Sequence, residues 1–388
     1  MSTHPGGAAA SRAGTEERLM RECMKLALRG RGRVSPNPLV GAILVRNGRI
    51  IARGWHRRFG GPHAEVDCLR NARGNLTGTT LFVNLEPCAH YGKTPPCTER
   101  IIDSGIRSVV IAMKDPNPLV SGRGIRALRR SGVRVTCGVL EADAKQLNRV
   151  FLKHITRRMP YVHVKIAQTI DGFIGGERAP RYLSSAPSLR LVHKWRAEHD
   201  AVMVGAGTVH ADNPHLTVRH YRGHDPHVVV LDGSLSIPER ANVLSRDRGR
   251  GVFLCVSGDA AARVPGKVKR LEARGIVVLR FSAPGGIIDL RDVLSSLYRF
   301  SIGSVLVEGG SSIFNQCIEK GLADELSIFI TPSMLGSGVP AFGRRIRQNS
   351  PSRPTTGFHV HRSGKDILFT TQFKQGRSPT CSRALSRK

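Results

Sequence analysis

The segment that decides the fold of this chain begins with Pro62-His63-Ala64-Glu65 and ends with Pro87-Cys88-Ala89-His90-Tyr91-Gly92-Lys93-Thr94-Pro95-Pro96-Cys97. It supplies one imidazole, two thiols and one carboxylate. Three nitrogen and sulfur ligands, with a fourth position open to water, are typical of a catalytic zinc site. The pattern therefore predicts one zinc ion per chain, bound by His63, Cys88 and Cys97, with Glu65 left for proton transfer.

The spacing within this segment assigns each group a task. His63 and Glu65 are two residues apart at the expected start of a helix, so their side chains project in different directions. Cys88 is expected at another helix N-terminus, where backbone amides favour the thiolate that binds metal. A closed structural zinc site would need a fourth thiol or imidazole in place of Glu65, which argues against a purely structural zinc protein.

Length and composition bound the class of protein. A chain of 388 residues with 40% hydrophobic residues predicts two domains of ordinary size. It has no apolar run long enough to span a membrane and no continuous apolar segment at its start, so we expect a soluble cytoplasmic protein. The eight cysteines are scattered, which argues against a disulfide scaffold. Five are expected to be small core residues: Cys23, Cys68, Cys137, Cys255 and Cys317.

The formal net charge of +31 is the most unusual bulk property. The terminal segments 1–14 and 376–388 hold only five of the basic residues, so the charge belongs mainly to the folded part. Such a charge attracts phosphorylated metabolites and nucleic acid alike. A general bias of the source organism towards basic residues explains the net charge equally well.

Strands and helices alternate along the chain. Helices are expected from residue 15 and at 63–69, 98–104, 124–131, 141–154, 185–199, 289–298 and 311–320. Strands are expected at 39–45, 49–52, 79–84, 107–113, 133–136, 161–168, 201–204, 227–231, 252–256, 276–279, 304–307, 325–331 and 366–373. This order predicts α/β domains with largely parallel sheets. The expected domains are 15–155 and 156–375, between a disordered N-terminus (1–14) and a disordered basic tail (376–388).

The loop between the two cysteines points to a family. His-x-Glu followed by Pro-Cys and a second Cys is the signature of zinc cytidine and nucleobase deaminases, but most have two residues between the cysteines and this chain has eight. With Pro36-Asn37-Pro38-Leu39-Val40-Gly41, Gly60-Gly61-Pro62-His63 and Asp115-Pro116-Asn117-Pro118, the segment closely resembles the bifunctional riboflavin-biosynthesis deaminase/reductase family. The resemblance covers about residues 16–373. It implies an N-terminal three-layer cytidine-deaminase-like sandwich and a C-terminal dihydrofolate-reductase-like α/β domain.

The resemblance also implies a substrate for the first domain. That substrate is a diaminopyrimidinone carrying a ribosylamino 5-phosphate, which loses the amino group at pyrimidine C2. Asn37, His56, His90 and Lys93 are implied to hold the base and the phosphate. The residues alone show only that these polar side chains flank the zinc segment in turns, and a solvated loop residue is an equally good interpretation of His56 or Lys93.

Two glycine-rich turns follow apolar strands in the second half, Gly205-Ala206-Gly207-Thr208 and Glu308-Gly309-Gly310-Ser311. Glycine lets the backbone approach a phosphate closely, and a following helix N-terminus supplies N–H donors. Neither turn matches Gly-x-Gly-x-x-Gly, so a Rossmann domain is not predicted. Purely structural turns are an equally good interpretation. Together with Asp212-Asn213-Pro214 and Leu216-Thr217-Val218-Arg219, however, they resemble the reductase half of the family, which uses NADPH to reduce the ribose moiety to a ribityl chain.

The reductase resemblance implies two sets of residues. Contacts to NADPH are implied for Ala167, Tyr182, Thr208, Asp212, Gly309 and Gly310. Contacts to substrate are implied for Arg196, Leu216, Arg219 and Glu308, where guanidinium groups would suit the 5-phosphate. The chain has Pro180-Arg181-Tyr182 where many relatives have Ser-x-Trp. Tyr182 can stack on a nicotinamide but Pro180 offers no hydroxyl, so the pattern supports the deaminase half more fully.

A rival hypothesis from the charge is an RNA-editing deaminase, or an RNA-binding protein with a deaminase fold. The long loop between Cys88 and Cys97 and the complete second domain argue against it. The expected partner is therefore a small phosphorylated pyrimidine, with neither nucleic acid nor a membrane. We also expect a homo-oligomer, either a dimer or a tetramer.

Overall fold

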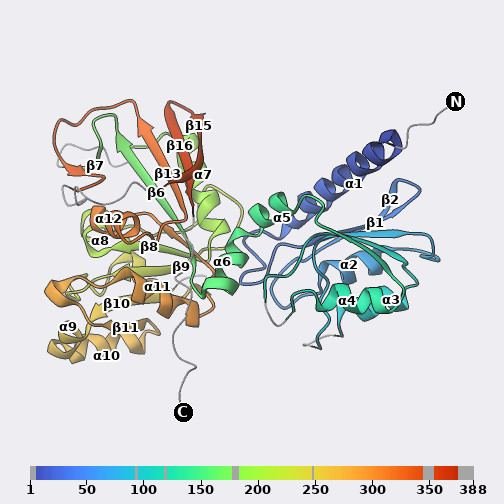
Figure 1. Ribbon diagram of the computed structural model, residues 1–388. Coiled ribbons are helices and arrows are strands. Elements are labelled where there is room, and N and C mark those ends of the chain that lie inside the picture. The colour runs from blue at the N-terminus through green and yellow to red at the C-terminus, as the bar shows by residue number, and fades with distance from the viewer. Residues whose placement is uncertain are drawn as a thin grey trace, which may run out of the picture. The chain divides into compact units, whose positions relative to one another are not determined.

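The structure is a computed structural model that describes residues 6–91, 95–117, 120–176, 183–246, 249–343 and 354–374. The chain divides into two compact units (Figure 1). The first comprises Met1–Pro160 and Ser295–Gly303, and the second comprises Tyr161–Leu294 and Ser304–Lys388. Both units combine helices with a sheet, so the predicted α/β class is confirmed.

Five strands form the sheet of the first unit, in the order β2-β1-β3-β4-β5. β1 is antiparallel to β2 and β3, whereas β3, β4 and β5 run parallel to one another. The central strands β1, β3 and β4 are buried along nearly their whole length, as expected for strands covered on both faces. Their bounds are β1 (Gly41–Arg46), β2 (Arg49–Trp55), β3 (Thr80–Leu85), β4 (Ser108–Met113) and β5 (Arg134–Cys137).

Helices cover both faces of this sheet (Figure 1). α1 packs on β1 and β3 and α5 packs on β4, while α2 packs on β1 and β2 at the opposite face together with α3 and α4. This arrangement is the three-layer sandwich that was expected. The helices are α1 (Gly6–Ala27), α2 (Ala64–Asn71), α3 (Cys97–Asp103), α4 (Arg123–Arg130), α5 (Glu141–Leu147) and α6 (Arg149–Arg157).

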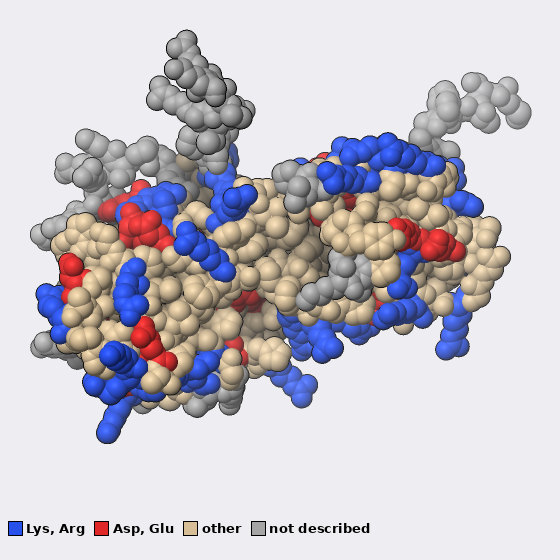
Figure 2. Space-filling view, turned by 90° about the horizontal axis from the view of Figure 1, so that it is seen from below, with Lys and Arg blue, Asp and Glu red and all other residues tan. Residues whose placement is uncertain are grey.

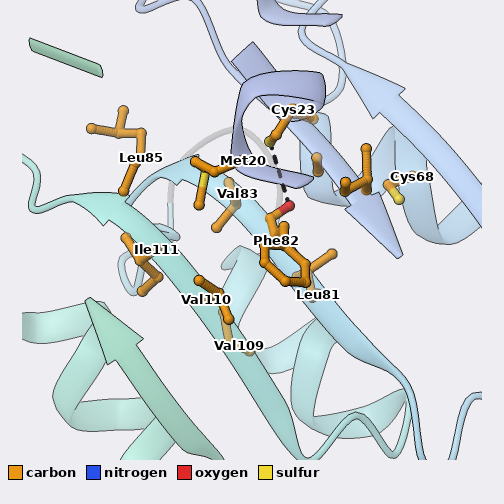
Figure 3. Packing of buried hydrophobic residues seen from close by; sticks show 14 of the residues in the cluster. Met20, Cys23, Cys68, Leu81, Phe82, Val83, Leu85, Val109, Val110 and Ile111 are labelled. Carbon is orange, nitrogen blue, oxygen red and sulfur yellow. Dashed lines mark hydrogen bonds between the residues drawn. The ribbon is translucent and has the colours of Figure 1, made fainter. Parts of the chain in front are cut away.

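The core between α1 and the sheet is closely packed (Figure 3). Met20 and Cys23 of α1 lie beside Phe82 and Val83 of β3. The Cys23 thiol donates to the carbonyl oxygen of Gly41 at 2.7 Å, and a longer contact of 3.6 Å reaches the carbonyl oxygen of Phe82. A side chain at Gly41 would overlap the backbone of Cys23, so glycine is what allows α1 to approach β1 this closely.

The cysteines outside the zinc segment behave as core residues. Cys23, Cys68, Cys255 and Cys317 are buried and Cys137 is half-buried. Burial raises the pKa of the Cys23 and Cys255 thiols, so both stay protonated and apolar in character. Cys381 lies outside the described residues.

Nine strands form the main sheet of the second unit, in the order β11-β10-β9-β8-β12-β6-β13-β16-β15. All neighbours are parallel from β11 to β13, and β16 and β15 add two antiparallel pairings at one edge. The strands are β6 (Tyr161–Thr169), β8 (Ala201–Gly205), β9 (His227–Leu231), β10 (Val252–Ser257), β11 (Val277–Phe281), β12 (Ser304–Val307), β13 (Glu325–Thr331), β15 (Thr355–Ser363) and β16 (Asp366–Phe373).

Several helices in this unit begin at or shortly after strand ends, among them α8 and α12 at the two glycine-rich turns. α8 follows β8 without a loop, and α12 starts four residues after β12. A short antiparallel pair, β7 (Phe173–Gly175) with β14 (Val339–Pro340), stands apart from the main sheet. The helices are α7 (Ala186–Glu198), α8 (Ala206–Asp212), α9 (Gly258–Arg263), α10 (Pro265–Ala273) and α12 (Ser311–Glu319), together with the first residues of α11 (Leu290–Arg299), whose remainder belongs to the first unit.

The structure differs from the sequence expectation at several places, including the short strands β7 and β14, which were not predicted. α1 begins at Gly6, so residues 6–14 are helical and not disordered as expected. Alanines at 8–10 favour a helix, but they carry no apolar periodicity that would reveal it. β15 was not predicted because it is exposed along its length. The short helices α8, α9 and α10 were also missed.

Figure 2 shows basic side chains on the surface of both units, with fewer acidic side chains scattered among the basic ones. The charge is therefore a property of the folded units, as the sequence indicated. None of the helices in the described part of the chain combines the length and hydropathy needed to span a lipid bilayer.

The contact between β2 and α2 leads to a test of the first unit. A Cβ at Gly54 would overlap the backbone of Ala64 and Cys68. We expect Gly54→Ala to lower the free energy of unfolding of this unit by about 1–3 kcal/mol, because α2 must move away from the sheet. Gly14→Ala is the matched control: it lies exposed on α1 with open space around it and should leave stability unchanged or raise it by up to about 1 kcal/mol. Urea unfolding measures both, and equal midpoints would contradict the expectation.

Candidate functional site

Three predicted metal ligands from separate elements meet in the first unit. His63 precedes the first residue of α2, Cys88 follows the end of β3, and Cys97 is the first residue of α3. Nδ1 of His63 lies 3.2 Å from Sγ of Cys97 and 3.5 Å from Sγ of Cys88. All three ligand atoms lie within 4.8 Å of one another. One nitrogen and two sulfurs at this spacing suit a tetrahedral zinc ion with one position open.

Hydrogen bonds prepare Cys88 to bind a cation. The expectation that Cys88 itself begins a helix is wrong, because the helix begins at Cys97 and Cys88 lies in the preceding loop. The backbone N–H of Cys97 nevertheless donates to Sγ of Cys88 at 3.3 Å. Hydrogen bonds from the Cys97 thiol, the His63 ring and this amide lower the pKa of the Cys88 thiol to about 4. The thiolate is the form that a metal ion binds.

Glu65 is the buried acid of the site. It is the second residue of α2, its exposed fraction is 4%, and it is not one of the three clustered ligands. Burial raises the pKa of its carboxyl to about 7, although the neighbouring His63 opposes part of this rise. A carboxyl with a pKa near neutrality is suited to accept a proton and return it.

His56 joins the site through hydrogen bonds of both ring nitrogens. Nδ1 donates to the carbonyl oxygen of Pro62 at 2.9 Å, and the Asn37 side-chain amide donates to Nε2 at 3.1 Å. The ring also lies edge-on to His63, with centroids 5.9 Å apart. Both nitrogens are therefore occupied within the protein, and His56 orients Asn37 and the chain that leads into His63.

The remaining predicted residues of this half lie in the loop between the cysteines. His90 is exposed there. Lys93 lies outside the described residues, as do Gly92 and Thr94 of the same loop.

Glu86 is a residue of this site that the sequence analysis missed. Its carboxylate is buried and accepts backbone N–H groups from Asp115 at 3.2 Å, Gly122 at 2.9 Å and Ile125 at 3.1 Å. Because Glu86 lies two residues before Cys88, these bonds attach the segment that carries a metal ligand to the start of α4. An acid directly after an apolar strand was the available signal, and it was not used.

A large cavity occupies the second unit. Its volume is about 1680 Å³, and it lies where β6, β8 and β12 end. All the predicted reductase residues that the structure describes line it: Ala167, Arg196, Thr208, Asp212, Leu216, Arg219, Glu308, Gly309 and Gly310. Tyr182 and Pro180 lie outside the described residues.

The two glycine-rich turns approach each other at this cavity. A Cβ at Gly309 would come within 2.6 Å of Oγ1 of Thr208, so only glycine fits there. Gly310 has φ of +90°, a conformation that residues with side chains rarely adopt. The two turns thus present bare backbone to the cavity, as expected for a site that holds phosphate groups.

A buried ion pair crosses the cavity wall. Nε and Nη2 of Arg196 donate to the two carboxylate oxygens of Glu308 at 2.6 and 2.9 Å, and Nη1 donates to the carbonyl oxygen of Thr217 at 3.1 Å. Burial alone would raise the pKa of Glu308, but the Arg196 guanidinium outweighs it and the pKa is lowered. The carboxylate of Glu308 therefore balances the positive charge of Arg196 within the protein.

Lys165 is a second residue that the sequence analysis missed. It lines the same cavity, and burial lowers the pKa of its ammonium group while Glu308 opposes that shift. A lysine inside the apolar run of β6 was the available signal. Neither Lys165 nor Arg219 forms an ion pair with any residue that the structure describes.

Comparison with known proteins covers both units. The family model described as the cytidine and deoxycytidylate deaminase zinc-binding region matches residues 13–113, and the model of the RibD C-terminal domain matches residues 160–368. The riboflavin biosynthesis protein RibD of Aquifex aeolicus is 36% identical over 91% of this chain and 97% of its own length. RibD of Bacillus amyloliquefaciens is 38% identical over 93% and 97%.

A solved structure agrees with these relatives. The diaminohydroxyphosphoribosylaminopyrimidine deaminase/5-amino-6-(5-phosphoribosylamino)uracil reductase of Thermotoga maritima aligns with a TM-score of 0.80 at 36% identity. The alignment covers 94% of this chain and all of that one.

The ligand cluster predicts the zinc content of variants. We expect Cys88→Ser to lose most of the zinc that the unaltered protein retains, because a hydroxyl replaces the thiolate at one of three ligand positions. Cys137→Ser is the matched control, since Cys137 is half-buried and belongs to no ligand cluster in the described chain. Elemental analysis of purified protein measures both variants. Equal zinc in Cys88→Ser and the unaltered protein would remove Cys88 from the site.

Proposed function

This chain belongs to the RibD family of riboflavin biosynthesis proteins, and we propose that it catalyses two successive steps of that synthesis. The first, in a deaminase domain at 15–155, removes ammonia from 2,5-diamino-6-ribosylamino-4(3H)-pyrimidinone 5′-phosphate. The second, in a reductase domain at 156–375, uses NADPH to convert the ribosyl group to ribityl. The observation that carries the proposal is the meeting of His63, Cys88 and Cys97 beside the buried carboxyl of Glu65.

In the deaminase step, His63, Cys88 and Cys97 would hold the zinc ion. When bound, zinc makes a water molecule nucleophilic at neutral pH. Glu65 accepts a proton as the water oxygen bonds to pyrimidine C2, and it returns the proton to the amino group that leaves as ammonia. The products are a C2 carbonyl and ammonia, so one water is consumed. Asn37, oriented by His56, is proposed to hold the base, with His90 and Lys93 from the cysteine loop.

In the reductase step, the proposed contacts to NADPH are Ala167, Tyr182, Thr208, Asp212, Gly309 and Gly310. The cofactor supplies a hydride to C1′ of the ribosylamino group, and one proton completes the reduction. Lys165 is an ionisable group in the cavity wall that can hold that proton, since burial lowers the pKa of its ammonium group. Leu216 and Arg219 are proposed to contact substrate. Arg196 is proposed to act through Glu308, whose charge and orientation it sets.

The proposed substrate is a small phosphorylated pyrimidine and not nucleic acid. Family membership spans both units, and the second unit has a cavity lined by the implied cofactor and substrate residues. Net charge alone suggests RNA, and a field of this sign serves a phosphorylated metabolite equally well.

We further propose a cytoplasmic homo-oligomer, a dimer or a tetramer. The edge strand β15 and its neighbour β16 carry exposed apolar side chains, with exposed fractions of 65% for Phe358, 55% for Val360 and 49% for Ile367. An unpaired strand edge with apolar side chains is a common site of association between copies of a chain.

Mass analysis after incubation with the diaminopyrimidinone nucleotide tests the two activities. Without NADPH, we expect a gain of about one mass unit and release of ammonia, because OH replaces NH₂. With NADPH, we expect a further gain of about two mass units as hydride and proton add. Folded, zinc-loaded protein that leaves the nucleotide unchanged would contradict the deaminase proposal, and absence of the second gain would contradict the reductase proposal.

Glu65→Gln separates proton transfer from metal binding. The amide keeps the size of the side chain but cannot carry the proton, so we expect deamination to fall by about 10²–10⁴-fold or more. Zinc content and reduction of the deaminated nucleotide should stay unchanged, which makes the second activity an internal control. Deamination at the unaltered rate would overturn the role of Glu65.

A further inference from the structure

One face of α7 forms part of the cavity wall in the second unit. Leu189, His193 and Arg196 all line the cavity, and residues three or four apart on a helix lie on the same face. The side chain of Arg196 forms an ion pair with Glu308. His193, one turn earlier, has an exposed fraction of only 3% and was not identified from the sequence.

A hydrogen bond determines which nitrogen of His193 carries the proton. The backbone N–H of Arg219 donates to Nδ1 of His193 at 3.0 Å, so Nδ1 is an acceptor. A neutral imidazole with an acceptor at Nδ1 has its hydrogen on Nε2. Burial, followed by the charges of Arg196, His220 and Arg219, lowers the pKa of His193 to about 4, against a smaller opposing effect of Glu308. The ring is therefore neutral near pH 7, with one N–H to donate.

That N–H has no hydrogen-bond acceptor among the residues that the structure describes. The ring lies edge-on to His220, with centroids 4.8 Å apart, and borders the cavity. The ring as a whole is buried, but Nε2 is not among the buried side-chain atoms without a partner, so this donor is open to the cavity, where a ligand oxygen would accept its hydrogen.

The surroundings of His193 indicate which oxygen that is. Arg219, attached to the ring by its backbone, is exposed at the cavity and has no ion pair among the described residues. Arg196, by contrast, is balanced by Glu308. An unbalanced guanidinium beside a neutral N–H donor suits an anion with several oxygens, such as a phosphate ester.

We infer that His193 binds the 5-phosphate of the reductase substrate by donating its Nε2 hydrogen, beside the guanidinium of Arg219. The inference rests on the proposed reductase function and deepens it. His193 has two contacts in this arrangement: Nδ1 holds the Arg219 backbone, and Nε2 contacts the phosphate.

Two substitutions separate these contacts. His193→Asn keeps an acceptor near the position of Nδ1 and removes the donor at Nε2. His193→Gln reaches the position of Nε2 with an amide donor and removes the acceptor near Nδ1. Each variant is assayed for NADPH oxidation with the deaminated nucleotide and with the same compound lacking its phosphate.

We expect His193→Asn to lose about ten- to hundred-fold in kcat/KM with the phosphorylated substrate, chiefly through KM, and much less with the dephosphorylated one. His193→Gln should stay within a few-fold of the unaltered protein on both. Equal losses of His193→Asn on the two substrates, or no loss on either, would overturn the inference. A large loss in His193→Gln alone would also overturn it, because it would leave His193 only a role in holding Arg219.

If His193→Asn does not fold, His193→Gln still tests the inference. A loss of kcat/KM in His193→Gln that is equal on the phosphorylated and dephosphorylated substrates would contradict phosphate binding by His193. Thermal unfolding and NADPH affinity check that each variant is folded. The unaltered protein separates this inference from the proposed function: if it oxidises no NADPH with the deaminated nucleotide, the reductase proposal itself fails.

Discussion

A strand that is covered on both faces accommodates charged side chains most easily at its ends, and β3 and β12 follow that rule, whereas Lys165 within β6 is an exception. β3 has no charged residue as far as Leu85, and Glu86, Pro87 and Cys88 follow at once. β12 is wholly buried, and Glu308 follows it directly. Parallel neighbours end at the same edge of a sheet. Polar groups that are distant in the chain therefore gather there, and the ligand cluster and the cavity are the two results.

Three buried carboxyl groups differ in how far their charge is compensated. Glu308 has a bidentate guanidinium partner, and removing one member of such a pair typically costs about 3–5 kcal/mol because the other charge is left unpaired. Glu86 has three backbone N–H donors and acts as a structural anchor. For Glu65, burial outweighs the neighbouring His63 and the hydrogen bond with the Cys97 thiol, so the pKa of its carboxyl is raised to about 7. The least compensated of the three is the one suited to exchange a proton.

Much of the fold could be predicted from local pattern. The alternation of strands and helices predicted both α/β units, because an apolar run between turn residues marks a buried strand whatever lies beside it. β15 could not be found in this way, since its side chains are exposed and it is a strand only because it pairs with β16. The start of α1 at Gly6 escaped for a related reason: residues 6–14 have helix-forming alanines but no apolar stripe.

By itself, the sequence determined the chemistry available to this protein: which groups could bind zinc, which acid remained for proton transfer, and which glycines could leave backbone bare. Only the tertiary structure decided how those groups are used. Both ring nitrogens of His56 form hydrogen bonds, one with Asn37 and one with Pro62. Arg196 forms an ion pair with Glu308, 112 residues away. A hydrogen bond forms only where donor and acceptor meet within about 3 Å, and folding alone decides which distant residues come that close.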